Sequence, residues 1–242
     1  MDAKNLIKIL DRMYKIFERA MAGFSLDCRK GCSDCCTCNV TATRLETAYF
    51  FSRLTRDEAE TVRARLGKGL PSKRYRPRLT TNGFASACVL GKEVEKEQND
   101  PDWGRCPLIE DRQCTVYDAR PFGCRSMVSE IACTKNGYAS MPPLALTISN
   151  IFLQYIEHLD ASGFSGNFFD MLGFYLDGEN KGAAMDDFSG YLSLENIQGY
   201  DNTGVFIKHC KIPALMIPPG HRKKMAPILQ EITALMPGEA LT

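Results

Sequence analysis

The spacing of apolar and polar positions predicts a chain built mainly of helices. Near the N-terminus apolar residues recur at three- and four-residue steps with charges between them, which is typical of an amphipathic helix, and Gly23 is expected to end it. A second helix is expected over residues 43–54. A third is expected to begin at Thr55, because Thr55 and Glu58 match a capping box, and to stop at Gly67.

The second half of the chain carries a stronger helical pattern. Residues 148–159 hold a continuous apolar stripe, and shorter helices are expected over 168–176 and 222–236. The last of these is expected to be broken early by Pro227, since proline lacks the backbone N–H that a helix interior uses. Residues 178–217 show no sustained period and are expected to be irregular, with a few strand-like pieces.

The middle of the chain departs from the helical pattern. Residues 67–104 are polar and interrupted by proline and glycine, which favours a solvated loop. Residues 106–117 read as a small hairpin, because two short strand-like runs flank the turn-prone residues 110–113. Pro121 suits the first position of a helix that follows.

These elements predict a mainly α fold with small β-hairpin elements. The length of 242 residues fits one domain, expected over residues 1–242 and built around a cysteine-ligated metal centre. Within it, we expect a cysteine-cluster metal-binding region over 26–130 and a helical C-terminal part over 143–242.

Composition changes the picture in one respect, the number of cysteines. The chain has 11 cysteines among 242 residues, with 30 Lys+Arg against 29 Asp+Glu and a net charge of +1. The balanced charge argues against nucleic acid and acidic membranes as partners. Charged residues are spread through the first 22 residues, so this segment lacks the unbroken apolar stretch of a secretory signal. A cytoplasmic location is therefore expected. In that compartment thiols stay reduced, and clustered cysteines tend to bind metal or take part in catalysis.

Seven of the cysteines form two blocks separated by some 70 residues. The predicted ligands are Cys28, Cys32, Cys35 and Cys36 in the first block and Cys106, Cys114 and Cys124 in the second. Thiolates select zinc or iron–sulfur chemistry over magnesium or calcium. One structural zinc needs four ligands, so seven thiols suit either two metal sites or one four-cysteine cluster with spare thiols.

Other interpretations of these cysteines are weaker. The spacing of Cys28, Cys32 and Cys35 is also the one by which radical enzymes hold a 4Fe–4S cluster for S-adenosylmethionine. Against that reading, Asp34 stands where those enzymes usually carry an aromatic residue, and no series of alternating strands and helices follows. Cys38 is a possible spare ligand, whereas the remaining cysteines (Cys88, Cys133 and Cys210) lie outside both blocks.

The two blocks resemble the CxxCxxCC cysteine-cluster family, described as zinc- or iron-chelating proteins (the YkgJ-type family). The resemblance covers residues 26–130. It rests on the run CRKGCSDCC from Cys28 to Cys36, on Glu46, and on CPLI followed by CTVYDARPFGCR, which ends at Arg125. It implies a metal or iron–sulfur site built from both blocks, and no single reaction. A flagellin lysine methylase with S-adenosylmethionine chemistry looks like a relative, although this chain lacks a glycine-rich fingerprint after a strand.

Three further residues are candidates for supporting the bound group. Arg120 and Arg125 lie close to the second block, where a guanidinium can donate hydrogen bonds to thiolate sulfur and offset its charge. Glu46 is a candidate supporting partner or oxygen ligand. Solvated surface side chains are the alternative for all three.

The sequence therefore predicts a cytoplasmic protein that holds an iron–sulfur cluster (4Fe–4S) or zinc through two cysteine blocks. A cluster-dependent modifying enzyme, methyltransferase-like by the resemblance, and a metal carrier or chelator are the alternatives. No catalytic residue and no protein partner can be named from the pattern.

Overall fold

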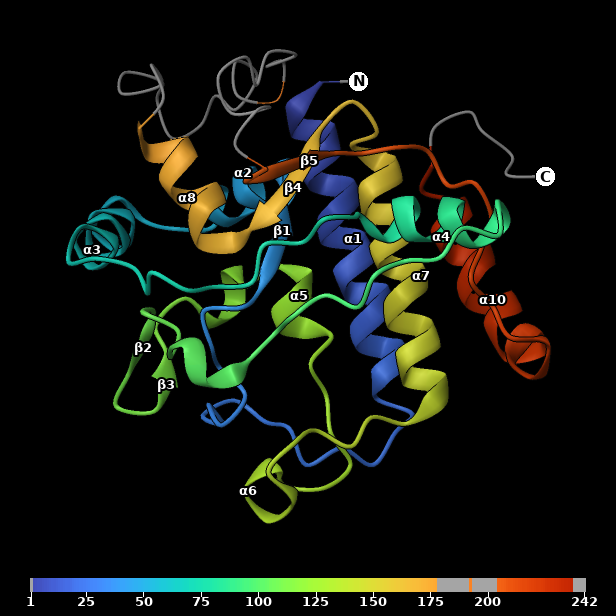
Figure 1. Ribbon diagram of the computed structural model, residues 1–242, viewed down its shortest axis with the longest axis horizontal. Coiled ribbons are helices and arrows are strands. Elements are labelled where there is room, and N and C mark those ends of the chain that lie inside the picture. Colours follow the sequence, from blue (N-terminus) through green and yellow to red (C-terminus); the bar gives the residue numbers. More distant parts are fainter. Residues whose placement is uncertain (1, 178–191, 193–203, 237–242) are drawn as a thin grey trace.

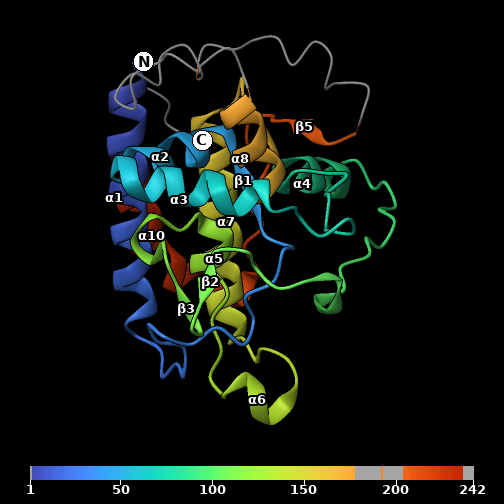
Figure 2. The ribbon, with the colours of Figure 1, turned by 90° about the vertical axis from the view of Figure 1, so that its left-hand side faces the viewer.

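Two long helices form the centre of the molecule. The structure is a computed structural model that describes residues 2–177, 192 and 204–236. Helices α1 (Ala3–Met21) and α7 (Pro143–Leu159) pack along each other, as Figures 1 and 2 both show. Helix α1 begins directly after Asp2, whose side chain accepts the backbone N–H of Asn5 at 2.8 Å.

The next two helices each begin at a capping box, of which the second was predicted. Thr43 and Glu46 form a capping box at the start of α2 (Arg44–Ser52). Thr55 and Glu58 form the expected box at the start of α3 (Arg56–Gly67). In each box two N-terminal backbone donors are satisfied by side chains, which fixes where the helix begins.

Aromatic side chains join the α1–α7 pair to the middle of the chain. The ring of Phe17 on α1 lies 4.7 Å from that of Phe122 and 5.3 Å from that of Phe152 on α7. All three are buried. Since buried aromatic pairs contribute beyond their area, this contact holds the segment around Phe122 firmly against the helices.

A three-stranded antiparallel sheet packs beside these helices. Its order is β1 (Thr41–Thr43), β4 (Phe164–Asn167) and β5 (Phe206–Lys208). The strands are too short to show a clear alternation of apolar and polar residues in the sequence, so β1 and β4 were not predicted. Gly166 is required where it stands, because a Cβ there would lie 2.7 Å from the ring of Phe206.

Helix α8 (Phe168–Asp177) follows β4 and covers α2. Its Asp170 accepts hydrogen bonds from the guanidinium groups of Arg74 and Arg76, the latter at 2.9 Å. These ion pairs fasten the segment after α3 to the rest of the fold.

The expectation of an unstructured loop over residues 67–104 was wrong in part. It contains helix α4 (Thr81–Val89) and the short 3-10 helix η1 (Pro101–Trp103). The carboxylate of Glu157 on α7 accepts the backbone N–H groups of Thr81 and Asn82 at 2.7 and 2.8 Å. This capping partner is 75 residues away in sequence, and local reasoning cannot find it.

Two other helix expectations need correction. Helix α5 is only Phe122–Arg125, with Pro121 as its N-cap rather than its first residue. Helix α10 (Arg222–Thr233) continues through Pro227 instead of breaking there. The short elements α6 (Cys133–Asn136), η2 (Tyr117–Ala119) and η4 (Pro219–His221) complete the described helices. Much of the irregular stretch expected over 178–217 lies outside the described residues.

The fold is thus mainly α with two small sheets, the second being the predicted hairpin described below. In the described part of the chain, none of the helices has the length and apolar character needed to cross a membrane.

Candidate metal centre

The second cysteine block begins with the predicted hairpin. Strands β2 (Ile109–Glu110) and β3 (Gln113–Cys114) pair antiparallel, with Ile109 opposite Cys114. The turn residues Asp111 and Arg112 have φ of 47° and 61°, as a tight two-residue hairpin turn requires. The hairpin thereby brings Cys106 and Cys114 to the same end of the structure.

Backbone hydrogen bonds connect the two blocks directly. The N–H of Cys106 donates to the carbonyl of Cys36 at 3.1 Å, and the N–H of Cys38 donates to the carbonyl of Gly104 at 2.9 Å. The Arg105 guanidinium adds a bond to the Ser33 carbonyl at 3.2 Å. Segments some 70 residues apart in sequence are therefore adjacent before any metal is considered.

Helix α5 supplies the last cysteine of the second block, Cys124. Its first residue is fixed by Glu46, whose carboxylate accepts the N–H of Phe122 at 2.6 Å. A Cβ on Gly123 would lie 2.9 Å from the Thr41 carbonyl oxygen, so the close approach of α5 to β1 depends on glycine. The contacts of Phe122 and Gly123 therefore hold Cys124 in place.

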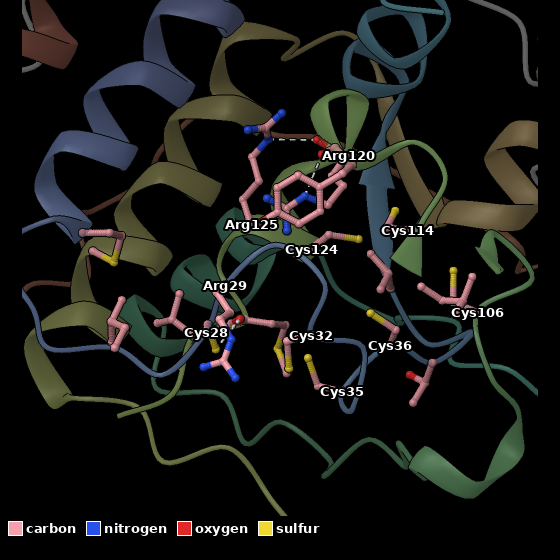
Figure 3. Close-up of a pocket in the computed structure, with 18 of the residues that line it drawn as sticks. Cys28, Arg29, Cys32, Cys35, Cys36, Cys106, Cys114, Arg120, Cys124 and Arg125 are labelled. Atoms are coloured by element: carbon pink, nitrogen blue, oxygen red, sulfur yellow. Dashed lines mark hydrogen bonds between the residues drawn. The ribbon is translucent and has the colours of Figure 1, made fainter. Parts of the chain in front are cut away.

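All seven predicted cysteines line a single cavity of about 310 Å³ (Figure 3). They are Cys28, Cys32, Cys35, Cys36, Cys106, Cys114 and Cys124. Each is a free thiol and each is partly exposed. In Figure 3 Cys28, Cys32 and Cys35 lie on one side, and Cys36 lies with the cysteines of the second block on the other.

The donors surround the cavity without forming a closed coordination shell. Among the described residues, no group of three or more His, Cys, Asp or Glu side chains is already close enough to hold a metal ion. The arrangement gathers soft donors around one space. It does not by itself select a metal or a number of sites.

Burial and mutual proximity make three of these thiols weaker acids. Burial raises the pKa of Cys106 to about 12, and burial together with the neighbouring Cys106 raises the pKa of Cys124. A hydrogen bond with Cys36, reinforced by burial, raises the pKa of Cys35. These three thiols therefore hold their protons at neutral pH, and a metal must displace those protons in order to bind them.

An eighth thiol lies near the first block, although it does not line the cavity. Cys133, at the start of α6, interacts electrostatically with Cys35 and Cys32, and it contributes to the raised pKa of Cys28. It is therefore close to three cysteines of the first block. Cys133 could not be singled out from the sequence, because it stands nine residues after Cys124 with no recognisable spacing.

Arg120 and Arg125 both line the cavity but have different surroundings. Arg125 donates to the carbonyls of Arg120 and Asp118 at 2.9 and 2.7 Å and to the carboxylate of Glu18 at 2.8 Å. It therefore braces the turn that precedes α5. Arg120 stacks over the ring of Tyr117 at 3.4 Å.

Arg120 is a cation that acts on two sulfurs of the second block. Burial raises the pKa of both Cys114 and Cys124, and the charge of Arg120 offsets part of that rise. Its Nε donates to the Tyr117 carbonyl at 2.8 Å, and its two terminal nitrogens have no hydrogen-bond acceptor among the described residues. The position fits the predicted role of offsetting thiolate charge.

Glu46 has a structural position and does not line the cavity. Its carboxylate accepts from the Thr43 and Phe122 backbone and from the Tyr14 hydroxyl, and burial raises its pKa. Both oxygens are thereby used within the protein. Glu46 positions α5 and is not placed to serve as an oxygen ligand.

The other cysteines and His209 lie away from the cavity. Cys38 is fully buried in the core, and Cys88 and Cys210 are exposed. His209 lies 2.6 Å from the Ser165 hydroxyl and 2.7 Å from the Asp160 carbonyl, so both of its ring nitrogens are occupied.

Comparison with known proteins adds no relative to this picture. No protein-family model matches the chain, and no curated protein or solved structure matches it.

Proposed function

We propose that this chain is a metal-binding protein whose two cysteine blocks together hold an iron–sulfur cluster or zinc. The observation that carries the proposal is the convergence of seven cysteines, drawn from a loop, a hairpin and a short helix, on one cavity. Free cysteine is often simply buried in a core, as Cys38 is. Seven thiols facing one space are not explained by core packing.

The donor set fits a thiophilic metal. The cavity offers thiol sulfur, and the one carboxylate among its described lining residues, Glu18, is paired with Arg125. Soft ligands of this kind favour zinc or iron–sulfur centres. When bound, an iron–sulfur cluster would supply electron-transfer chemistry, whereas zinc would supply a structural crosslink between the blocks.

The division of the thiols favours more than one metal position. Cys28, Cys32 and Cys35 lie near Cys133, while Cys36 faces the second block. Divided in this way, the thiols match two four-ligand sites. We prefer iron–sulfur over zinc because the number of thiols exceeds the four that one structural zinc needs, and the CxxCxxCC resemblance, carried by the same residues, fits either metal.

A cluster-dependent modifying enzyme is the second candidate function. The cavity is not filled by its thiols, since it extends to apolar side chains such as Phe17, Met21 and Val128. A purely structural metal site has no need for this additional space. A metal carrier, the third possibility, would be expected to expose its thiols more fully.

Metal and acid-labile sulfide analysis of anaerobically purified protein tests the proposal. Iron with matching sulfide and a broad visible absorption is expected. Zinc without sulfide would retain the metal-binding function and remove the cluster. Protein that takes up neither metal, although it is folded and fully reduced, would overturn the proposal.

A further inference from the structure

We propose that the cavity also binds a small organic carboxylate, with its charged end at Arg29 and its apolar body on the wall formed by the end of α1 and residues 127–128. This inference goes beyond metal binding and does not depend on it. It rests on two features of the lining: an apolar wall, and an arginine that has no partner among the residues the structure describes.

An apolar wall lines the same cavity as the cysteines. It consists of side chains from the end of α1, from the segment that follows it, and from the residues after α5: Phe17, Met21, Leu26, Met127 and Val128. Met127 is 42% exposed, so the wall reaches the mouth of the cavity. An apolar surface next to thiols donates no ligand to a metal, and it suits the hydrocarbon part of an organic molecule.

Arg29 stands beside this wall. The backbone N–H of Asp27 donates to the carbonyl of Ser129 at 2.8 Å, and the thiol of Cys28 points to the carbonyl of Met127 at 3.9 Å. These contacts place the segment that leads to Arg29 alongside residues 127–129. In Figure 3 Arg29 is drawn next to Cys28 at the edge of the cavity.

The guanidinium of Arg29 is available for a ligand. It forms no ion pair or hydrogen bond with any residue in the part of the chain that the structure describes. Nearby arginines differ in this respect: Arg125 pairs with Glu18, and Arg112 pairs with Asp34 at 3.1 Å. Arg120 acts on Cys114 and Cys124, which leaves Arg29 as the cation of the lining without an assigned role.

The lining offers a suitable donor for a carboxylate. Among the described lining residues, Arg29, Arg120 and Arg125 carry guanidinium groups, and Glu18 carries a carboxylate that is paired with Arg125. A carboxylate that reaches Arg29 meets a planar fork of donors suited to it. The volume of about 310 Å³ lies at the lower end of the range for ligand pockets, so a small molecule is indicated.

Calorimetric titration of the whole, metal-analysed protein with octanoate tests this site. 1-Octanol serves as the neutral match and inorganic phosphate as the anion without an apolar body. We expect octanoate to bind more tightly than either. Equal binding of octanol would show that Arg29 has no role, and equal binding of phosphate would show that the apolar wall has none; either result overturns the proposal.

Substitutions at Arg29 and Met127 test whether octanoate binds at the arginine and the apolar wall. Arg29→Gln should weaken octanoate binding about tenfold, the usual loss for one charge-assisted hydrogen-bonded contact. Met127→Glu should weaken it as well, whereas Met127→Lys should not. Arg63→Gln, at an exposed position on α3, is the matched control. Unchanged binding in Arg29→Gln would contradict the proposal.

Metal content measured on the same samples separates this inference from the proposed function. Loss of octanoate binding with unchanged metal content in Arg29→Gln is the expected result. Failure of the wild-type protein to bind octanoate while it holds metal would overturn the carboxylate site alone.

Discussion

The carboxylate of Glu46 accepts the backbone N–H of Phe122 at 2.6 Å, and this bond fixes the start of the helix that carries Cys124. The same carboxylate accepts from the Thr43 N–H at 2.8 Å and from the Tyr14 hydroxyl at 3.0 Å. One buried side chain therefore joins α1, α2 and α5. The position of the second cysteine block depends on a residue that does not touch the cavity.

Replacing Glu46 should affect stability and metal content together. Glu46→Ala leaves three donors without an acceptor inside the core, and we expect the free energy of unfolding to fall by about 3 kcal/mol. Glu46→Gln keeps an oxygen acceptor and should retain more of both properties. Urea unfolding and metal analysis provide the measurements, and a Glu46→Ala protein with wild-type stability would show that this carboxylate does not anchor α5.

The cysteines that line the cavity should differ sharply from those outside it. Cys35→Ser and Cys124→Ser, one in each block, are each expected to lower the metal bound per chain and the melting temperature. The shared loss is expected because binding energy at a structural metal site contributes to folding. Cys210→Ser is the control, since that thiol is exposed and away from the cavity. Equal metal content in all three variants would rule out the proposed ligands.

Cys133 is expected to behave as a ligand despite its position outside both blocks. Cys133→Ser should lower metal content in the same way as Cys32→Ser, because its thiol interacts with those of Cys28, Cys32 and Cys35. Cys88→Ser, at an exposed position on α4, should leave metal content unchanged. If Cys133→Ser and Cys88→Ser retain the same metal as the wild type, the first block binds without an eighth thiol.

Asp170 should contribute to acid sensitivity independently of the metal. Burial opposes its ionisation, but hydrogen bonds from Arg74 and Arg76 outweigh burial and hold its pKa below the ordinary 3.8. Because the folded-state pKa is lowered, the stabilisation is present above about pH 4 and is lost as the pH falls through the folded value.

The corresponding variant is Asp170→Asn. We expect it to lower the free energy of unfolding at pH 7 by about 2 kcal/mol, since two arginines lose their charged acceptor. The difference from the wild type should shrink as the pH approaches 2. Unfolding curves at several pH values measure this, and a difference that grows on acidification would contradict the assignment.

Local sequence signals predicted those features that depend on neighbouring residues. The box at Thr55, the hairpin turn at Asp111 and the two cysteine blocks each arise within a few residues, so composition and spacing were sufficient. The mainly α fold followed from helical periodicity in the same way.

The features that the sequence missed depend on distant partners. Helix α4 needs the Glu157 carboxylate of α7, and strand β1 needs β4. Cys133 has no spacing relation to the blocks, and Glu46 looked like a ligand because its partners Tyr14 and Phe122 are far away in sequence. In each case the deciding interaction forms only when the chain has folded.

The most direct test of the central claim is an anomalous difference map from crystals of the metal-loaded protein, collected at the iron or zinc edge. We predict peaks inside the cavity, with sulfurs from both Cys28–Cys36 and Cys106–Cys124 as the nearest protein atoms. Peaks only at other positions, or metal held by one block alone, would contradict the proposal that the two blocks form the metal centre together.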